Sequence, residues 1–312
     1  MSDPRSTAAP EVLEALAIAC ESARAACDPT LLEMARRRVA IMLGNQPELD
    51  AMAWGKLSPD QIEQLVDWPS SDAFDGRQKA ALALTEQFVL DVTGVLVGPL
   101  AAAAESLGTE LGPFVQGLYL LDVGQRVGVV LGALSGQTIT SDSWAWGVQG
   151  EVPNDPMVAI MSMLAAVGRL QVVDPVTKEL VRLRGARLHQ CRRCQSVRSV
   201  AALNSSANTD VFDVDDPESI QELSVGTQAA IDLVNATFLG PPNIDQGLIA
   251  RLTQSYNSEE LVELVNYLMR NACNKIPVAF GVDNAIVDEG FEYQIIDSSG
   301  ETLTVDASAL RA

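Results

Sequence analysis

Aromatic residues make up only 5% of this 312-residue chain, and 21 basic residues stand against 41 acidic ones, for a formal net charge of −20. With few aromatics and abundant Ala, Leu and Val, helices are favoured over a β-sandwich or barrel. A surface this acidic repels phosphate backbones and anionic lipids. We therefore expect binding neither to nucleic acid nor to a membrane surface.

Long apolar runs are also missing. The most apolar stretches, such as Val127 to Leu134, are too short to cross a bilayer. The start of the chain, Met1 to Pro10, is polar and has no basic flank leading into an apolar segment, as a signal peptide would have. We expect neither a signal peptide nor a transmembrane span, and hence a cytoplasmic protein.

Histidine occurs once, as His189, and cysteine five times. An odd number of scattered cysteines in a long chain is not the framework of a secreted disulfide-rich protein. Zinc bound by one CxxC pair would need about two more ligands, so we expect no metal, and no other cofactor is indicated. Three cysteines without suggestive spacing are expected to be small, mostly buried side chains: Cys20, Cys27 and Cys273.

Helical periodicity covers most of the sequence, which predicts an all-α fold. The helices expected in the first half are Glu11 to Ala26, Leu31 to Leu43, one from near Ser58, Arg77 to Val92, Val97 to Leu107, and Leu111 to Leu134. Near the C-terminus, Phe291 to Ile295 alternates in polarity, and a turn at Asp297 to Gly300 precedes Thr302 to Val305. This pattern predicts a short β-hairpin-like tail that covers its own chain or a neighbour.

The second half repeats the first. Three pairs of segments align at offsets between 146 and 150 residues: Leu32–Ala40 with Lys178–Ala186, Ala80–Phe88 with Ala230–Phe238, and Asp122–Arg126 with Asn271–Lys275. Glu33 then corresponds to Glu179, and Arg36 to Arg182. Ordered matches at a nearly constant offset predict an internal duplication.

The duplication and a Gly- and Pro-rich stretch from Gly136 to Pro156 set the expected domains. They are a helical domain over residues 1–140, a linker over 141–156, a second helical domain over 157–285 and a tail over 286–312. Trp144 and Trp146 lie in the linker, which suggests that it packs on a surface.

The chemically suggestive pair is Cys191 and Cys194. Two thiols three residues apart can close a disulfide with little backbone movement, one attacking a substrate and the other resolving the product. Six arginines crowd the segment: Arg182, Arg184, Arg187, Arg192, Arg193 and Arg198. Their charge, and a helix starting near Cys191, would favour the reactive thiolate. Glu179 could transfer a proton if the fold brings it to the dithiol.

Simpler interpretations stay open at this point. The CxxC pair could be purely structural or bind a metal, and the arginines could form a solvated helix face or an interface. Glu179 alone would be unremarkable. His189 lies near the thiols in sequence, but it could equally be an oriented residue at the end of a helix.

At these residues the chain resembles the carboxymuconolactone decarboxylase and AhpD-like (alkylhydroperoxidase) superfamily. Its redox members carry a glutamate, a CxxC twelve residues later, and a histidine four residues after the second cysteine; Glu179, Cys191 and Cys194 fit this spacing. The stretch Asn271 to Lys275 and the loop Asp67 to Pro69 also resemble the family. The resemblance covers about 31–134 and 176–281.

The resemblance implies two tandem AhpD-like helical domains and assembly into a homo-oligomer. It also implies reduction of a small organic hydroperoxide, or of a partner disulfide, through a Cys–Cys disulfide cycle. The glutamate and the histidine would relay protons, and a dithiol electron-donor protein of lipoyl or thioredoxin type would re-reduce the pair.

The sequence departs from the family pattern at two places. Arg198 stands where the family has its histidine, and arginine cannot shuttle a proton at neutral pH because its pKa stays above ~12. In the first half, Asn45 and Glu48 stand where cysteines would fall. We expect that half to be catalytically inactive, although Glu33 remains.

The leading hypothesis is a thiol-dependent peroxidase or disulfide oxidoreductase. Cys194 would attack, Cys191 would resolve, and Glu179 would transfer protons. Arg182 or Arg198 would lower the thiol pKa, with His189 in support. The alternatives are a non-enzymatic redox-sensing or scaffold protein of the same superfamily, and a metal-binding helical module.

Overall fold

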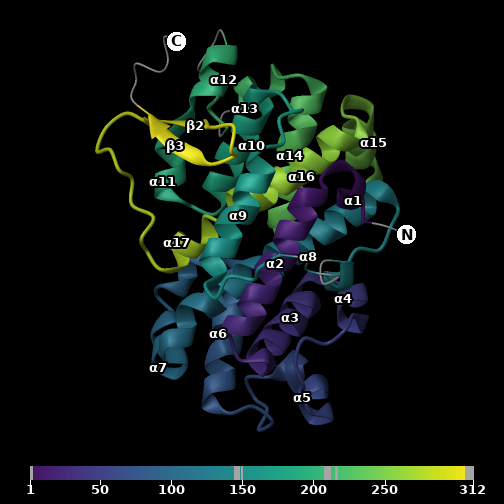
Figure 1. Cartoon of the computed structure of the whole chain (residues 1–312), viewed down its shortest axis with the longest axis vertical. Coiled ribbons are helices and arrows are strands. Elements are labelled where there is room, and N and C mark those ends of the chain that lie inside the picture. The colour runs from purple at the N-terminus through teal and green to yellow at the C-terminus, as the bar shows by residue number, and fades with distance from the viewer. Residues whose placement is uncertain (1–2, 144–147, 149, 207–211, 215–216, 306–312) are drawn as a thin grey trace.

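The fold is all-α with a small C-terminal hairpin, as the sequence predicts (Figure 1). The computed structural model describes residues 3–143, 148, 150–206, 212–214 and 217–305. The expectation that Trp144 and Trp146 pack on a surface concerns residues outside these ranges.

The first half holds α1 (Arg5–Ala8), α2 (Pro10–Ala26), α3 (Pro29–Leu43), α4 (Gln46–Asp50), α5 (Pro59–Gln64), α6 (Gly76–Leu90), α7 (Leu100–Leu107) and α8 (Leu111–Ser135), with 3-10 turns at η1 (Leu65–Asp67), η2 (Val92–Val95), η3 (Gly108–Glu110) and η4 (Ser141–Ser143). The second half holds α9 (Pro156–Gly168), α10 (Pro175–Leu188), α11 (Arg192–Gln195), α12 (Val200–Ser205), α13 (Pro217–Gln221), α14 (Val225–Phe238), α15 (Gln246–Ser255), α16 (Ser258–Ala272) and α17 (Lys275–Ala279). The strands are β1 (Val197–Ser199), β2 (Glu292–Ile296) and β3 (Thr302–Val305).

The same local chemistry starts the two helices that lead into the aligned segments. In α3, the side chain of Asp28 accepts a hydrogen bond from the Thr30 amide at 2.8 Å, and a proline follows the cap. In α10, Asp174 accepts from the Thr177 amide at 2.9 Å, again followed by a proline. An Asp cap satisfies free N–H groups, and proline fits the first turn because it has none to offer.

Both helices also end alike. The residue two positions after Leu188, Gln190, takes a left-handed conformation with φ of 52°, and Gly44 does so directly after α3 with φ of 63°. The amide that follows, of Cys191 or Asn45, returns to a carbonyl of the helix. The chain therefore reverses sharply at the point where the cysteines, or their first-half counterparts, begin.

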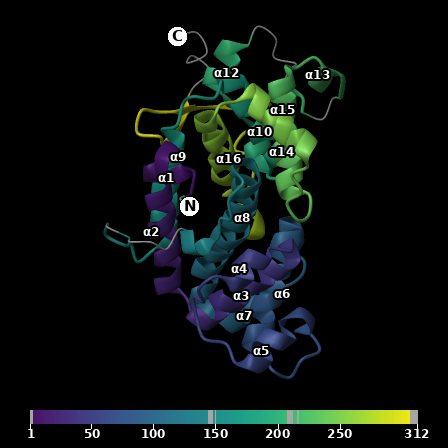
Figure 2. The same cartoon turned by 90° about the vertical axis from the view of Figure 1, so that its right-hand side faces the viewer.

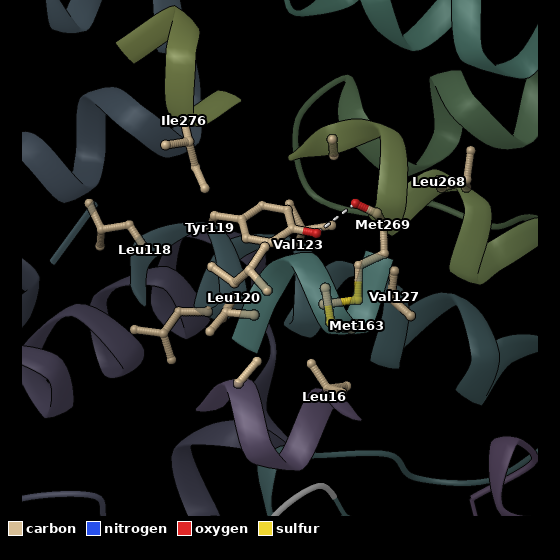
Figure 3. Packing of buried hydrophobic residues seen from close by; sticks show 14 of the residues in the cluster. Leu16, Leu118, Tyr119, Leu120, Val123, Val127, Met163, Leu268, Met269 and Ile276 are labelled. Carbon is tan, nitrogen blue, oxygen red and sulfur yellow. Dashed lines mark hydrogen bonds between the residues drawn. The ribbon is translucent and has the colours of Figure 1, made fainter. Parts of the chain in front are cut away.

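The two halves share one hydrophobic core (Figure 2). α2 packs along α9, and α8 runs through the centre of the molecule against α16. Figure 3 shows Tyr119 of α8 buried at this junction, where its hydroxyl donates to the Met269 carbonyl at 2.8 Å. The helices on either side of the expected linker therefore belong to a common packed interior.

A buried ion cluster also joins the halves. Asp122 of α8 accepts a hydrogen bond from Arg126 at 2.7 Å and pairs with Lys275 of α17. Burial opposes ionisation of Asp122, but the two cations lower its pKa below the ordinary value. A charged group this deep is tolerated because it is paired and hydrogen-bonded.

One helical stretch, Leu100–Ser135, is long and apolar enough by composition to cross a membrane. This stretch is longer than the short apolar runs seen in the sequence, because it joins α7, η3 and α8. Within its most apolar window, 78% is buried inside the protein. This burial identifies it as the core helix of the fold.

The C-terminal hairpin forms as predicted, with β2 and β3 antiparallel across the turn Asp297–Glu301. It covers its own chain, and it gains a third strand that the sequence analysis missed, since β1 pairs parallel with β2. At the turn, Gly300 lies directly against Gly168 of α9, and Arg169 donates to the Ser299 carbonyl at 3.0 Å. The hairpin thus ties the strand after the cysteine pair to α9.

We expect Gly168→Ala to lower the free energy of unfolding by about 1–3 kcal/mol, the usual cost of overpacking. The added Cβ would collide with the backbone of Gly300, which has little freedom to retreat. Gly185→Ala is the matched control, because a Cβ there meets nothing within 4 Å, and it should stabilise α10 by about 0.5–1 kcal/mol. Urea unfolding of the two variants checks the pair, and equal midpoints would contradict the close packing.

Candidate functional site

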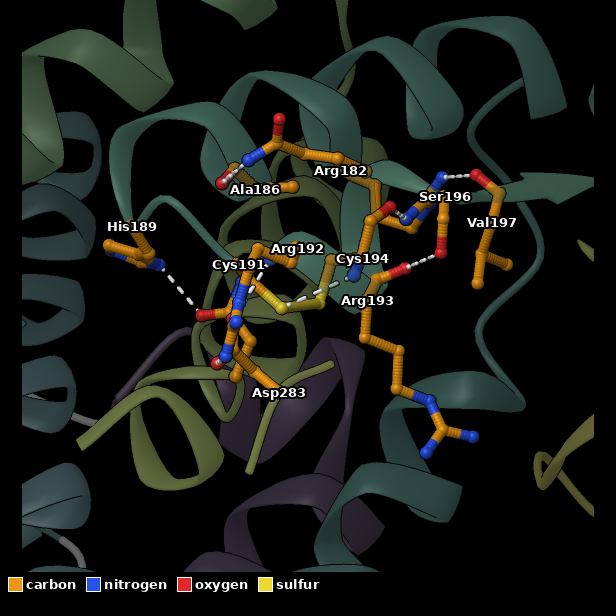
Figure 4. The surroundings of a disulfide bond; sticks show 12 residues. Arg182, Ala186, His189, Cys191, Arg192, Arg193, Cys194, Ser196, Val197 and Asp283 are labelled. Carbon is orange, nitrogen blue, oxygen red and sulfur yellow. Dashed lines mark hydrogen bonds and ion pairs between the residues drawn. A yellow bond between two sulfur atoms is a disulfide. The ribbon is translucent and has the colours of Figure 1, made fainter. Parts of the chain in front are cut away.

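Cys191 and Cys194 form a disulfide at the N-terminus of α11, with their Cα atoms 5.3 Å apart (Figure 4). Cys191 is the N-cap residue of this short helix, and its sulfur accepts a hydrogen bond from the Cys194 amide at 3.2 Å. Cys191 is only 1% exposed, whereas Cys194 is half-buried. The pair therefore has one sheltered and one more accessible sulfur.

Asp283 holds the start of α11 from outside the motif. Its carboxylate accepts from the Arg192 amide at 2.9 Å and from the Arg192 guanidinium at 2.7 Å, and its carbonyl accepts from the Arg193 amide at 2.8 Å. Burial opposes ionisation of Asp283, but these bonds lower its pKa below the ordinary value. The sequence analysis missed this residue, since nothing in the polar segment after α17 marks it.

Glu179 and Arg182 form a buried pair beneath the cysteines. The guanidinium donates to both carboxylate oxygens, at 2.7 and 2.8 Å, and also to the carbonyls of Cys194 and Val197, each at 2.7 Å. Glu179 accepts further from the Ser199 amide at 3.0 Å. Burial disfavours the charge on Arg182, but Glu179 raises its pKa above the ordinary value. Glu179 thus reaches the cysteine loop through Arg182 rather than by contact with sulfur.

The first half contains the same arrangement with different loop residues. Arg36 donates to both oxygens of Glu33, each at 2.9 Å, and to the carbonyl and carboxylate of Glu48. The Trp54 amide bonds to Glu33 at 2.8 Å, and the Ser141 amide bonds to Glu48 at 2.8 Å. Glu48, which stands where the second cysteine would fall, is fully buried in this network.

Arg198 contacts the residue before β2 and the backbone of the cysteine loop. Its guanidinium stacks on Phe291 at 3.7 Å from the ring centroid and donates to the carbonyls of Gln195 and Val197 at 2.8 and 2.9 Å. Burial lowers the pKa of Arg198 to about 10, so the side chain stays charged at neutral pH. The geometry gives Arg198 a role in joining the cysteine loop to the residue that precedes β2.

His189 is buried and faces away from the disulfide. Its Nδ1 lies 2.8 Å from Oδ1 of Asn274, and its ring meets Phe238 edge-on at 4.9 Å. It lines a cavity of about 240 Å³ together with Arg126 and Lys275. Asn274 lines the cavity of the cysteines instead. His189 therefore contacts a residue of the dithiol cavity wall, Asn274, without lining that cavity itself.

A cavity of about 310 Å³ opens at the disulfide. Arg193, Arg270, Asn271 and the free Cys273 lie in its wall. Cys20 and Cys27 are buried as expected, but Cys273 is half-buried in this wall. Burial raises the pKa of Cys273 to about 12, so it remains a protonated thiol. In the part of the chain that the structure describes, no three His, Cys, Asp or Glu side chains are placed to hold a metal ion.

We predict that the His189 imidazole stays neutral well below pH 6. Burial, reinforced by the charge of Lys275, lowers the pKa of His189 from 6.5 to about 3. Since His189 is the only histidine, one pair of NMR ring signals reports its titration. The unfolded state takes up a proton near pH 6.5 and the folded state does not, so this group costs stability as the pH falls from 6.5 towards 3.

In that window the free energy of unfolding should fall by about 1.4 kcal/mol per pH unit on account of His189. His189→Gln should remove this contribution and give a correspondingly shallower pH dependence in urea unfolding between pH 7 and 4. An NMR midpoint near 6.5 would show that the ring is exposed.

No protein-family model and no solved structure matches the chain. Two proteins of Mycobacterium tuberculosis do: uncharacterized protein MT2376 of strain CDC 1551 / Oshkosh and uncharacterized protein Rv2313c of strain ATCC 25618 / H37Rv. Each is 31% identical over 244 residues, which cover 77% of this chain and 84% of the relative. The chain therefore belongs to the family of these two mycobacterial proteins.

Proposed function

We propose that the protein is a thiol-dependent oxidoreductase that cycles Cys191 and Cys194 between dithiol and disulfide to reduce a small hydroperoxide or a disulfide. The observation that carries the proposal is the position of this pair. The two sulfurs are bonded, one is sheltered and the other is half-buried, and both line a cavity of about 310 Å³. A structural disulfide would need no such cavity.

The cycle begins with the thiolate of Cys194. It attacks the terminal oxygen of a hydroperoxide, the O–O bond breaks, the alcohol leaves with a proton, and a sulfenic acid forms. Cys191 then attacks this sulfur, and the S–S bond forms as water leaves. With a disulfide substrate, the thiolate instead attacks one sulfur and releases a thiol, and Cys191 displaces the second. In either case two electrons pass from the dithiol to the substrate.

Accessibility favours Cys194 as the attacking sulfur, because Cys191 is almost fully buried. The hydrogen bond from the Cys194 amide favours Cys191 as the leaving group during re-reduction. When a donor dithiol attacks Cys194, the electron pair of the S–S bond moves to Cys191, where that N–H group stabilises the thiolate. Both half-reactions therefore use the same exposed sulfur.

Glu179 and Arg182 are positioning residues in this proposal. Arg182 fixes the carbonyl of Cys194, and Glu179 holds Arg182 charged and oriented. Neither Arg198, which stacks on Phe291, nor His189, which lines the other cavity, has a direct path to sulfur. Proton transfer then falls to water in the cavity, which is slower than a dedicated relay.

A reducing compartment suits such a cycle, because it supplies electrons and keeps the free cysteines reduced. We therefore propose a cytoplasmic location and a dithiol protein as electron donor. Assembly into a homo-oligomer remains a prediction from the family resemblance.

A second candidate function is a redox sensor or scaffold that reacts once without turnover. It is favoured by the placement of His189 in a separate cavity and by the carboxylate network that replaces a dithiol in the first half. Multiple turnovers distinguish an enzyme from a sensor.

The test is a thiol count on the reduced full-length protein after reaction with a slight excess of cumene hydroperoxide between pH 5 and 9. Wild type should lose two of its five thiols, with a midpoint below the ordinary value of ~8.5, and should turn over repeatedly when dithiothreitol is added. Cys194→Ser should lose none by this route. Cys27→Ser, a buried cysteine remote from the cavity, is the control and should still lose two.

Thiols that stay inert, or that react like ordinary cysteine, would rule out the oxidoreductase. Loss of two thiols without turnover would contradict the enzyme and support the redox sensor.

A further inference from the structure

We propose that the substrate of this dithiol is an anion: a small molecule with a carboxylate close to the disulfide or peroxide bond that is reduced. The inference rests on the proposed function and adds a substrate class to it. It comes from the balance of charge around the cavity, which is opposite in sign to the net charge of −20 of the whole chain.

Two arginines near the cysteines are already neutralised. Arg182 pairs with Glu179 at 2.7 Å, and Arg192 pairs with Asp283 at 2.7 Å. Each ion pair positions the cysteine loop. Because its two charges cancel, neither arginine offers a net positive charge to a ligand.

Two other arginines in the cavity wall have no such partner. Among the described residues, the guanidinium of Arg193 has neither an ion pair nor a hydrogen bond, and Figure 4 shows its side chain extending away from the disulfide. Arg270 donates to the Leu164 carbonyl at 3.0 Å and to the Thr302 hydroxyl at 2.7 Å, both neutral acceptors. The cavity wall therefore carries two cations for which the described residues show no ion pair, while Asp283, the carboxylate in the same wall, is paired with Arg192.

Asn271 supplies an independent sign of a missing acceptor. Its side-chain Nδ2 is buried in the cavity wall and has no hydrogen-bond partner. A buried donor left unpaired costs about 1–3 kcal/mol, and a ligand oxygen would remove that cost. The preceding residue is Arg270, so the amide and one guanidinium enter the cavity wall from the same end of α16.

A carboxylate is an acceptor suited to each of these three groups. Its two oxygens accept from planar guanidinium groups in a paired geometry, and they also accept from an amide N–H. In a strongly acidic protein, a local cluster of cations concentrates anions at the cavity and raises their rate of encounter. A ligand bearing an amine in the same place would be repelled by Arg193 and Arg270.

The dithiol cavity is large enough for a small molecule, and a second cavity lies next to it. The dithiol cavity of about 310 Å³ shares Met157 and Arg270 with a larger cavity of about 980 Å³ between α2, α9 and the hairpin turn. The two cavities therefore adjoin at Met157 and Arg270.

The experiment uses three disulfides of similar size and different charge: 3,3′-dithiodipropionate (anionic), bis(2-hydroxyethyl) disulfide (neutral) and cystamine (cationic). Each is first titrated calorimetrically into the oxidised full-length protein, in which the dithiol is closed and cannot react. We expect the anionic compound to bind at least about tenfold more tightly than the neutral one, a difference of about 1.4 kcal/mol. Cystamine should bind more weakly than either, and added salt should reduce the differences in affinity among the three compounds.

The reduced protein is then mixed with each compound, and the rate constant of thiol oxidation is measured. Arg193→Gln and Asn271→Ala should each lower the ratio of anionic to neutral rate constants by about threefold to tenfold, which corresponds to about 0.7–1.4 kcal/mol. Arg251→Gln is the matched control: it removes the same charge from an arginine paired with Asp232, away from the cavity. That variant should keep the wild-type ratio.

The two proposals fail in different ways. Equal binding of all three compounds overturns the anionic substrate class, whatever the rates are. Tight, charge-dependent binding without any thiol oxidation supports the anion site and overturns the oxidoreductase. A ratio that falls equally in Arg251→Gln would show that only overall charge matters, and it would also overturn the site.

Discussion

A buried guanidinium must have both its charge and its N–H groups satisfied, and the way Arg182 meets this requirement fixes the cysteine loop. Glu179, one turn earlier on α10, neutralises it, and the remaining donors reach the carbonyls of Cys194 and Val197. Because removing one partner of a buried pair costs about 3–5 kcal/mol, the loop can hardly leave this position while the helix is folded. The disulfide is therefore held by a charge pair whose members do not touch sulfur.

The first half has the same buried charge pair but no cysteines in the loop that the pair holds. Glu33 and Arg36 repeat the pair on α3, and Arg36 again donates to the carbonyl of the residue at the second cysteine position, Glu48. There the loop side chain turns inward and joins the ion network, so the space that a dithiol would face is filled by Glu48 and its bonds to Ser141. The same charge pair thus holds a loop with a cysteine pair in the second half and a loop with Asn45 and Glu48 at those positions in the first half.

The parts of this arrangement that depend on local sequence were predictable. An Asp-Pro helix start, a glutamate and an arginine three positions apart, and two cysteines after the helix end are all visible in the chain, and so is the hairpin. Asp283, Asn271 and the pairing of β1 with β2 were not, because each depends on distant segments meeting in three dimensions, such as Arg192 and Asp283, which are 91 positions apart. His189 shows the same limit. Its closeness to Cys191 in sequence suggested a shared site, but the reversal at Gln190 sends the two side chains to different cavities.

The distribution of charge follows from the same separation of roles. An acidic surface keeps most anions away from the protein, yet the function that we propose needs a cysteine loop basic enough to favour a thiolate and to attract a substrate. The fold meets both demands by pairing the arginines that position the loop, Arg182 and Arg192, and leaving Arg193 unpaired at the cavity. Six arginines in one segment are therefore not one uniform positive patch. Arg182 and Arg192, which have carboxylate partners, hold the cysteine loop, and Arg193 is the member of the segment to which we attribute the proposed preference for an anion.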